Sequence, residues 1–217
     1  MEIYHVLNRG VDKRDVVMDD SDRLRFVHSL FVFNDANQLN ENHRKRDVVL
    51  SVSDRKPLVH IHAWCLMNNH YHLLLSPVDD DLKNLSRFMK KLNMGYARYF
   101  NERHDRSGYL WQGKYKKISL TRDAHFLYIP YYVHLNPLDY HMKEWRHGGV
   151  ADIEKATHVL NQYRWSSYLD YTGVKNFPSV IHISLLRDLL GDTKKQITQI
   201  SKIIFTTEHH GTANIIE

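Results

Sequence analysis

Two histidines separated by one residue are the most direct sign of chemistry in this 217-residue sequence. His70-Tyr71-His72 lies in an apolar segment typical of a strand, in which alternate side chains point to the same face. Two imidazoles on one face can bind a single divalent metal ion. However, chance predicts about one His-x-His pattern in a chain so rich in histidine, and His60-Ile61-His62 is a second. Spacing alone leaves both pairs, and a packing role for either, open.

A second candidate group lies on a helix later in the chain. Tyr128, Tyr132 and Asn136 stand four residues apart, so they share one helical face. Tyr132 and Asn136 could place a phenol and an amide oxygen beside a metal ion. Because the chain has 13 tyrosines, a tyrosine stripe in the hydrophobic core explains the spacing as well. Pro130, inside the same helix, removes one backbone hydrogen bond and predicts a kink before Tyr132.

Basic and aromatic residues are mixed between Trp111 and Lys117. Trp111 could stack on a nucleic-acid base while Lys114, Lys116 and Lys117 contact phosphates. A half-buried edge strand with lysines on its outer face explains the same pattern.

This stretch belongs to a longer basic segment, residues 83–122. It holds eleven basic and two acidic residues, a net charge of +9 in a chain whose total is +5. Such a concentration favours a polyanion-binding surface, with a solvated helix face as the alternative.

Composition limits the class of protein. The sequence is 42% hydrophobic and 25% charged, as in an ordinary globular domain. A single cysteine, Cys65, excludes an intramolecular disulfide. The N-terminal residues do not resemble a signal peptide, and no apolar run is long enough to span a membrane. We therefore expect a cytoplasmic protein without a membrane partner.

The predicted elements place these residues in a common fold. Strands are expected at 3–8, 58–67, 70–76 and 114–120. Helices are expected to start near residue 20 and after Asp79–Asp81, and a third helix to run towards Asn136. The order β-α-β-β-α-β predicts an α+β, ferredoxin-like (RRM-like) sandwich, with an antiparallel sheet of about four strands and helices on one face. We expect this domain to span residues 1–140. Residues 141–217 are predicted to be an extension with a helix near 183–190 and a loose tail.

Several short motifs, in order, resemble the REP-associated tyrosine transposases, which are single-tyrosine HUH nucleases. The segment 65–75, Cys-Leu-Met-Asn-Asn-His-Tyr-His-Leu-Leu-Leu, is similar to the metal-binding strand of that family. The segments 4–10, 96–101, 107–108, 110–116 and 132–137 resemble its first strand, its central helix, the following loop and strand, and its catalytic helix. Trp165-Ser-Ser-Tyr168 resembles a block after the catalytic domain, so the match spans about residues 3–168.

The resemblance implies a role for each matching residue. His70 and His72 match the metal-binding histidines, Tyr132 the nucleophile, and Asn136 a polar side chain that completes the metal site. His60 and His62 match no family ligand. Asn68 replaces a proline that is common in the family, at a turn. Arg9, Lys13 and Arg14, after the first strand, are predicted DNA contacts alongside Trp111, Lys114, Lys116 and Lys117.

The implied activity is that of a transposase-like, metal-dependent endonuclease and strand transferase acting on single-stranded or hairpin DNA. The phenol attacks a phosphodiester, leaving a 5′-phosphotyrosine and a free 3′ end. Mixed nitrogen and oxygen ligands fit Mg²⁺ or Mn²⁺. We expect a monomer rather than a homodimer. Two alternatives remain at this point: a non-catalytic, domesticated nucleic-acid-binding descendant, and a His-x-His metallohydrolase acting on a small molecule, which the +9 segment disfavours.

Overall fold

The computed structural model describes residues 1–37, 55–120 and 124–205, with side chains in these ranges apart from 124–127. The strands are β1 (Ile3–Arg9), β2 (Val59–Leu66), β3 (His70–Pro77) and β4 (Lys116–Leu120). The helices are α1 (Asp20–Val32), α2 (Leu82–Arg103), α3 (Ala124–Leu135), α4 (Ile153–Gln162), α5 (Tyr168–Tyr171), α6 (Ser184–Leu190) and α7 (Thr193–Phe205). Short 3₁₀ helices are η1 (Val11–Lys13), η4 (Val78–Asp80), η5 (Asn136–Tyr140) and η6 (Lys143–His147).

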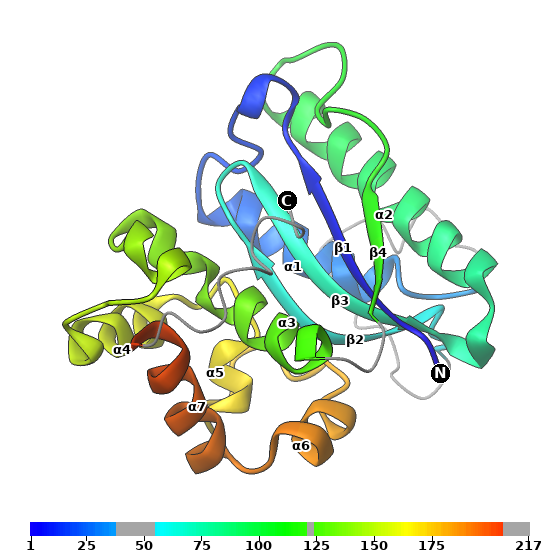
Figure 1. Cartoon of the computed structure of the whole chain (residues 1–217). Coiled ribbons are helices and arrows are strands. Elements are labelled where there is room, and N and C mark those ends of the chain that lie inside the picture. The colour runs from blue at the N-terminus through cyan, green and yellow to red at the C-terminus, as the bar shows by residue number, and fades with distance from the viewer. Residues whose placement is uncertain (38–54, 121–123, 206–217) are drawn as a thin grey trace.

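The described strands form one antiparallel sheet in the order β2-β3-β1-β4. Figure 1 shows α1 and α2 on one side of this sheet, with α3 and the C-terminal helices on the other. Each side has its own hydrophobic core. The predicted ferredoxin-like sandwich is confirmed, and α3 with the extension is the addition that covers the second face.

The alternation of side chains along β3 explains why both faces are covered. Tyr71, Leu73 and Leu75 pack into the core beneath α1 and α2, whereas Leu74 packs toward α3. All eight residues of β3 are buried. A strand that is buried on both faces must lie between two layers.

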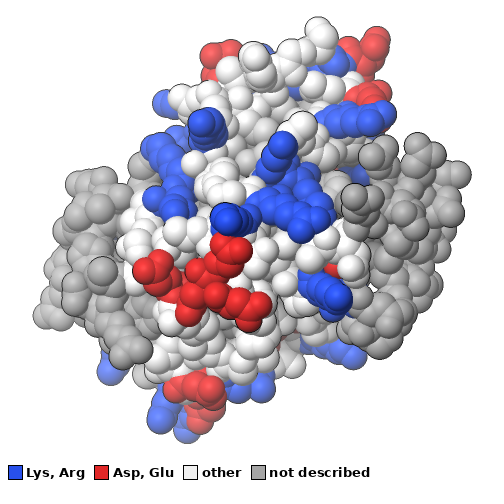
Figure 2. Space-filling view, turned by 90° about the vertical axis from the view of Figure 1, so that its right-hand side faces the viewer, with Lys and Arg blue, Asp and Glu red and all other residues white. Residues whose placement is uncertain are grey.

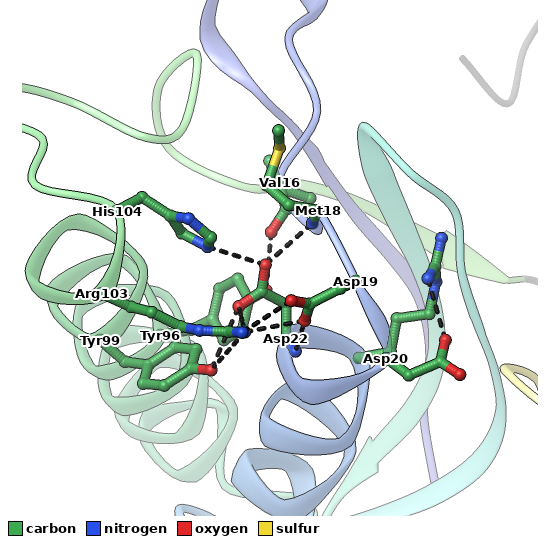
Figure 3. A network of polar contacts seen from close by, with 10 residues as sticks. Val16, Met18, Asp19, Asp20, Asp22, Tyr96, Tyr99, Arg103 and His104 are labelled. Carbon is green, nitrogen blue, oxygen red and sulfur yellow. Dashed lines mark hydrogen bonds and ion pairs between the residues drawn. The ribbon is translucent and has the colours of Figure 1, made fainter.

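A buried carboxylate ties α1 to the end of α2 (Figure 3). Asp22 has no exposed surface and lies within hydrogen-bond distance of four groups: the Met18 backbone N–H (2.8 Å), the Tyr99 hydroxyl (3.1 Å), Arg103 Nη1 (2.5 Å) and His104 Nε2 (2.9 Å). Arg103 also pairs at 2.6 Å with Asp19, the N-cap of α1. A buried charge is tolerated when it is paired in this way, and the network fixes the segment that joins β1 to α1.

The extension packs along the outer edge of β2. The backbone N–H groups of Leu66 and Ser167 donate to the carbonyls of Trp165 and Trp64, each at 2.9 Å, and the His182 N–H donates to Ile61 at 2.7 Å. Residues from α4 to α7 share one core with α3. The predicted helix near 183–190 is confirmed as α6, but the extension is more helical than expected. Its predicted loose tail, residues 206–217, lies outside the described residues, and the domain boundary at residue 140 stays a prediction.

Candidate active site

The His70–His72 pair lies at the start of β3, on the face covered by α3. The two ring centroids are 5.0 Å apart, and the residues are only 6% and 0% exposed. Burial lowers the pKa of His70 to about 4 and that of His72 well below its usual value, so both rings are neutral at pH 7. Each Nε2 atom is buried and has no hydrogen-bond partner within the described part of the chain. Two neutral imidazoles with unpaired nitrogens are suited to binding a metal ion.

The other ring nitrogen of each histidine is held by a neighbour. His70 Nδ1 lies 2.6 Å from Asn69 Oδ1, which can only accept, so the proton is on Nδ1 and Nε2 keeps its lone pair. His72 Nδ1 lies 2.9 Å from Nε2 of His5, a β1 residue whose ring stacks on His72. When Nδ1 of His72 donates in this contact, its Nε2 is also free to act as a ligand. Such outer partners fix the orientation of metal-binding histidines.

Tyr132 of α3 lies directly beside these rings. Its ring meets that of His72 edge-on at 5.6 Å and that of His5 at 6.1 Å, and it has no exposed surface. Tyr128 and Tyr131 instead line a cavity with residues of α6 and α7. Pro130 lies inside α3, which continues to Leu135. The structure therefore brings the predicted nucleophile to the predicted histidine pair.

Asn136, the first residue of η5, is oriented by the end of α3. Its Nδ2 donates to the Tyr132 carbonyl at 2.7 Å, so its Oδ1 is the atom left for other partners. Arg146 of η6 lies between the two predicted site residues. Its Nη2 is 3.4 Å from Asn136 Oδ1, and its Nη1 donates to the Tyr132 hydroxyl at 3.0 Å.

A cavity of about 530 Å³ opens beside the histidine pair. His70 and Asn69 form part of its wall, and four cations surround it: Arg9, Lys13, Lys143 and Arg146. Two carboxylates, Asp15 and Asp139, also line it. Cations that surround a cavity next to potential metal ligands suit a phosphate group.

The predicted DNA contacts fall into two surfaces. Arg9 lines both the cavity above and a smaller one, of about 190 Å³, that also involves Lys114 and Lys116. In the register of β4 on β1, Lys116 lies opposite Leu7 and Lys117 opposite Val6. Neighbouring residues of a strand point to opposite faces. Lys117 consequently lies on the α1/α2 side, 4.6 Å from the Tyr4 ring centroid.

Trp111 and Arg14 are placed differently from the other predicted contacts. Trp111 is 8% exposed, its ring packs against Tyr71, and its Nε1 donates to the Asn93 carbonyl at 3.0 Å. This burial favours a packing role instead of the predicted stacking on a base. Arg14 is exposed and lies 3.8 Å from the Asp12 carboxylate.

The remaining basic residues of segment 83–122 are mostly on α2. Arg87, Lys90, Lys91 and Arg98 line a groove of about 530 Å³ with Arg25 of α1, on the side of the sheet away from the histidine pair. Figure 2 turns the right-hand side of Figure 1 to the viewer, and it shows several blue patches of Lys and Arg side chains around a red cluster of Asp and Glu. The +9 segment therefore serves both faces of the sheet.

The alternative pair, His60 and His62, has different surroundings. His62 Nε2 is 2.8 Å from Ser76 Oγ, and the His60 ring packs against His182 at 4.3 Å. The Nε2 atom of His62 therefore already has a hydrogen-bond partner, unlike the Nε2 atoms of His70 and His72. Among the described residues, no group of three or more His, Cys, Asp or Glu side chains is placed to hold a metal ion.

Comparison with known families identifies the chain. The family model described as "Transposase IS200 like" matches residues 26–136, slightly more than half of the sequence. The chain belongs to the IS200-like transposase family. The matched region includes His70, His72, Tyr132 and Asn136.

One solved structure, described as "Structure of the REP associates tyrosine transposase bound to a REP hairpin", is similar over 81% of this chain and 82% of that chain, at 14% identity and a TM-score of 0.44. No curated protein matches the sequence. None of the helices in the described part of the chain has the length and apolar character needed to cross a lipid bilayer.

Three residues that contact the site were not predicted from the sequence: His5, Asp139 and Arg146. His5 was within a recognised motif, and its alternation with Leu7 along the first strand could have placed it on the histidine face. Arg146 and Asp139 had no such signal, because the 3₁₀ helices η5 and η6 that bring them together have no regular apolar period.

Proposed function

We propose that this protein is a metal-dependent endonuclease and strand transferase for single-stranded DNA, with Tyr132 as its nucleophile. The observation that carries the proposal is the pair of buried, unpaired Nε2 atoms of His70 and His72 beside the Tyr132 ring. A buried polar atom without a partner is costly. Two of them, held in place by His5 and Asn69 next to a phenol, are well explained by a ligand that binds both.

The donor set fits a divalent metal ion. His70 and His72 would supply two nitrogens and Asn136 an amide oxygen, a mixed set compatible with Mg²⁺ or Mn²⁺. When bound, such an ion would polarise the scissile phosphate and offset charge on the leaving oxygen. Asn136 Oδ1 lies 3.4 Å from Arg146 Nη2, a long contact that the amide would give up to hold the metal ion.

The chain's own groups account for the remaining steps. The Tyr132 oxygen attacks phosphorus, the bond to the 3′ oxygen breaks, and the 3′ oxygen leaves with the electron pair and gains a proton. The 5′-phosphotyrosine that forms retains a phosphodiester, so a 3′-hydroxyl can reverse the step and join strands without an external energy source. Burial of Tyr132 excludes water that would compete with that hydroxyl.

Cations around the site are the proposed DNA-binding groups. Arg9 lines both the cavity beside His70 and the one lined by Lys114 and Lys116, so a strand could pass from one to the other over Arg9. Lys13 lines the first cavity as well. We propose single-stranded or hairpin DNA as the substrate, and a cytoplasmic location because the substrate is DNA.

We also propose that Tyr132 acts within its own chain, in a monomer. α3 packs on β2 and β3 of the same chain. His134, two residues after Tyr132, places its Nε2 2.8 Å from Ser167 Oγ in the extension, which anchors the helix.

Trapping the covalent intermediate tests the function. Full-length protein is incubated with labelled single-stranded and hairpin DNA in Mg²⁺ or Mn²⁺, and adducts are separated under denaturing conditions and mapped by mass spectrometry. Tyr132→Phe should abolish the adduct while DNA binding is retained, and Tyr128→Phe is the matched control. His70→Ala should also abolish it, whereas His60→Ala should be much milder.

Three outcomes would count against the proposal. An adduct on Tyr128 or Tyr131 would refute the choice of nucleophile. Equal loss in a folded His60→Ala variant would refute the choice of histidine pair. DNA binding without an adduct under any metal condition would favour the non-catalytic alternative.

A further inference from the structure

Arg146 connects the buried nucleophile to the open cavity. Its side chain is 18% exposed and lines the cavity beside His70. The Tyr132 ring is fully buried, but its hydroxyl accepts a hydrogen bond from Arg146 Nη1 at 3.0 Å. The guanidinium carbon is also 5.4 Å from the centre of the Tyr132 ring. Arg146 is thus placed to contact both the phenol oxygen and a phosphate in the cavity.

Asp139 fixes the direction in which the guanidinium points. Its Oδ1 accepts from Arg146 Nε at 2.9 Å, and its Oδ2 accepts from Nη2 at 2.5 Å. Trp145 Nε1 donates to the same Oδ1 at 2.7 Å, so the carboxylate itself is anchored. A two-point pairing between carboxylate and guanidinium defines the plane of both groups. In this plane, Nη1 is the nitrogen directed at Tyr132.

Building on the proposed function, we propose that Arg146 is a further catalytic residue, whose guanidinium stabilises the negative charge that develops on the Tyr132 oxygen during attack. The same group then contacts the phosphate oxygens of the adduct. Asp139 is a positioning residue, which acts only through Arg146.

The chemistry of the step defines what Arg146 can and cannot do. The phenol oxygen bonds to phosphorus and loses its proton. The bond from phosphorus to the 3′ oxygen breaks, and that oxygen leaves with the electron pair and gains one proton, so the step is balanced. An arginine side chain stays protonated, so Arg146 does not accept the phenol proton. Its contribution is a fixed donor and a full positive charge at an oxygen that becomes more negative, in a place from which water is largely excluded.

A purely structural role is the competing explanation. The Arg146–Asp139 pair lies between η5 and η6, where both side chains are mostly buried, at 18% and 20% exposed. Breaking it leaves a mostly buried charge and would lower stability on its own. Loss of activity in one variant therefore identifies nothing unless binding, chemistry and folding are measured separately.

The experiment compares Arg146→Gln and Arg146→Lys with a matched control, Arg164→Gln. Arg164 also belongs to the extension and stacks on aromatic rings, at 5.1 Å from Trp165 and 5.2 Å from Phe177, outside the site. For each full-length variant we would measure the DNA dissociation constant and the single-turnover rate of adduct formation at saturating DNA. The NMR shift of ¹³Cζ-labelled Tyr132 without DNA reports directly on the hydroxyl contact.

We expect Arg146→Gln to slow adduct formation at saturating DNA by about 100-fold, the usual effect of removing one donor to a developing oxyanion, and to weaken DNA binding by a much smaller factor. Arg146→Lys should lose less, because it keeps the charge but not the two-point geometry. Both variants should shift the Tyr132 Cζ signal, whereas Arg164→Gln should match wild type in every measurement. If Arg146→Gln does not fold, the double variant Asp139→Asn/Arg146→Gln removes both charges and takes its place.

The possible failures are distinguishable. A wild-type protein that forms no adduct overturns the proposed function, and the catalytic role of Arg146 with it. An active wild type with a wild-type rate in Arg146→Gln, an unshifted Cζ signal, or a rate that falls only in proportion to DNA affinity overturns the role of Arg146 alone.

Discussion

His5 offers a sharp test of how the histidine pair is prepared for a metal ion. His5→Phe keeps an aromatic ring that can stack on His72 but removes the nitrogen that lies 2.9 Å from His72 Nδ1. His5 is fully buried, so no water replaces the lost partner without rearrangement. The substitution therefore alters one hydrogen bond and little of the packing.

The expected magnitude follows from the two states left to His72. If its proton stays on Nδ1, a buried donor has no acceptor, which costs about 1–3 kcal/mol. If the proton moves to Nε2, the lone pair of that nitrogen is lost and it cannot act as a ligand. Either outcome should weaken metal binding by about 10–100-fold, the usual effect of removing an outer partner, or about 1.4–2.7 kcal/mol.

Calorimetric titration of the full-length protein with Mn²⁺ measures this directly. His62→Phe is the matched control, because His62 is a buried histidine of the same sheet whose Nε2 pairs with Ser76. Circular dichroism of each variant checks folding. Equal Mn²⁺ affinity in His5→Phe and wild type, with binding abolished by His70→Ala, would refute the orienting role of His5.

Three further predictions concern the anchoring of α3, the two faces of β4 and acid stability. Ser167→Ala removes the acceptor of the Trp64 N–H (2.9 Å) and the partner of His134; it should lower the free energy of unfolding by about 1–3 kcal/mol in urea and slow adduct formation more than it weakens DNA binding, and an unchanged urea midpoint would contradict it. Lys116→Gln should reduce the log–log salt dependence of DNA binding by about 0.7, while Lys117→Gln should leave it unchanged; equal slopes would refute the assignment of the two lysines to opposite faces. Burial lowers the pKa of His62 to about 4, against about 6.5 in the unfolded chain. Between pH 6.5 and 4 the unfolded state therefore binds one proton more than the folded state. As the pH is lowered through this window, the free energy of unfolding decreases by up to about 1.4 kcal/mol per pH unit for this group. His62→Gln should flatten the slope by that amount in urea titrations at pH 5 and 6, and an unaltered slope would show that His62 does not contribute.

Local periodicity was enough to predict the pieces of the candidate site. Alternation along β3 placed His70 and His72 on one face, although only the family resemblance chose them over His60 and His62. Four-residue spacing grouped Tyr132 of α3 with Asn136, which follows α3 as the first residue of η5. Both rules depend only on the geometry of a single element. The order of elements was then sufficient to predict the sheet, because few topologies accommodate β-α-β-β-α-β.

Contacts between distant elements could not be predicted in this way. Trp111 follows a loop, and its burial depends on the space between Tyr71 and α2. Arg146 reaches Tyr132 only because Asp139 and Trp145 fix the path of two irregular 3₁₀ helices. Lys116 and Lys117 were grouped by charge, although the pleat of a strand separates neighbours. Charge and composition describe a segment, whereas faces and partners depend on tertiary structure.

The outer edge of the sheet is covered late in synthesis. β2 ends at Leu66, but the residues that bond its outer edge, Trp165 to His182, are added about 100 residues later. At about 5–20 residues per second, the N–H and C=O groups of that edge wait about 5–20 s for their partners. An unpaired edge can pair with another chain. The newly made protein therefore passes through a period in which it is prone to aggregate, and a chain that stops before Trp165 would not leave it.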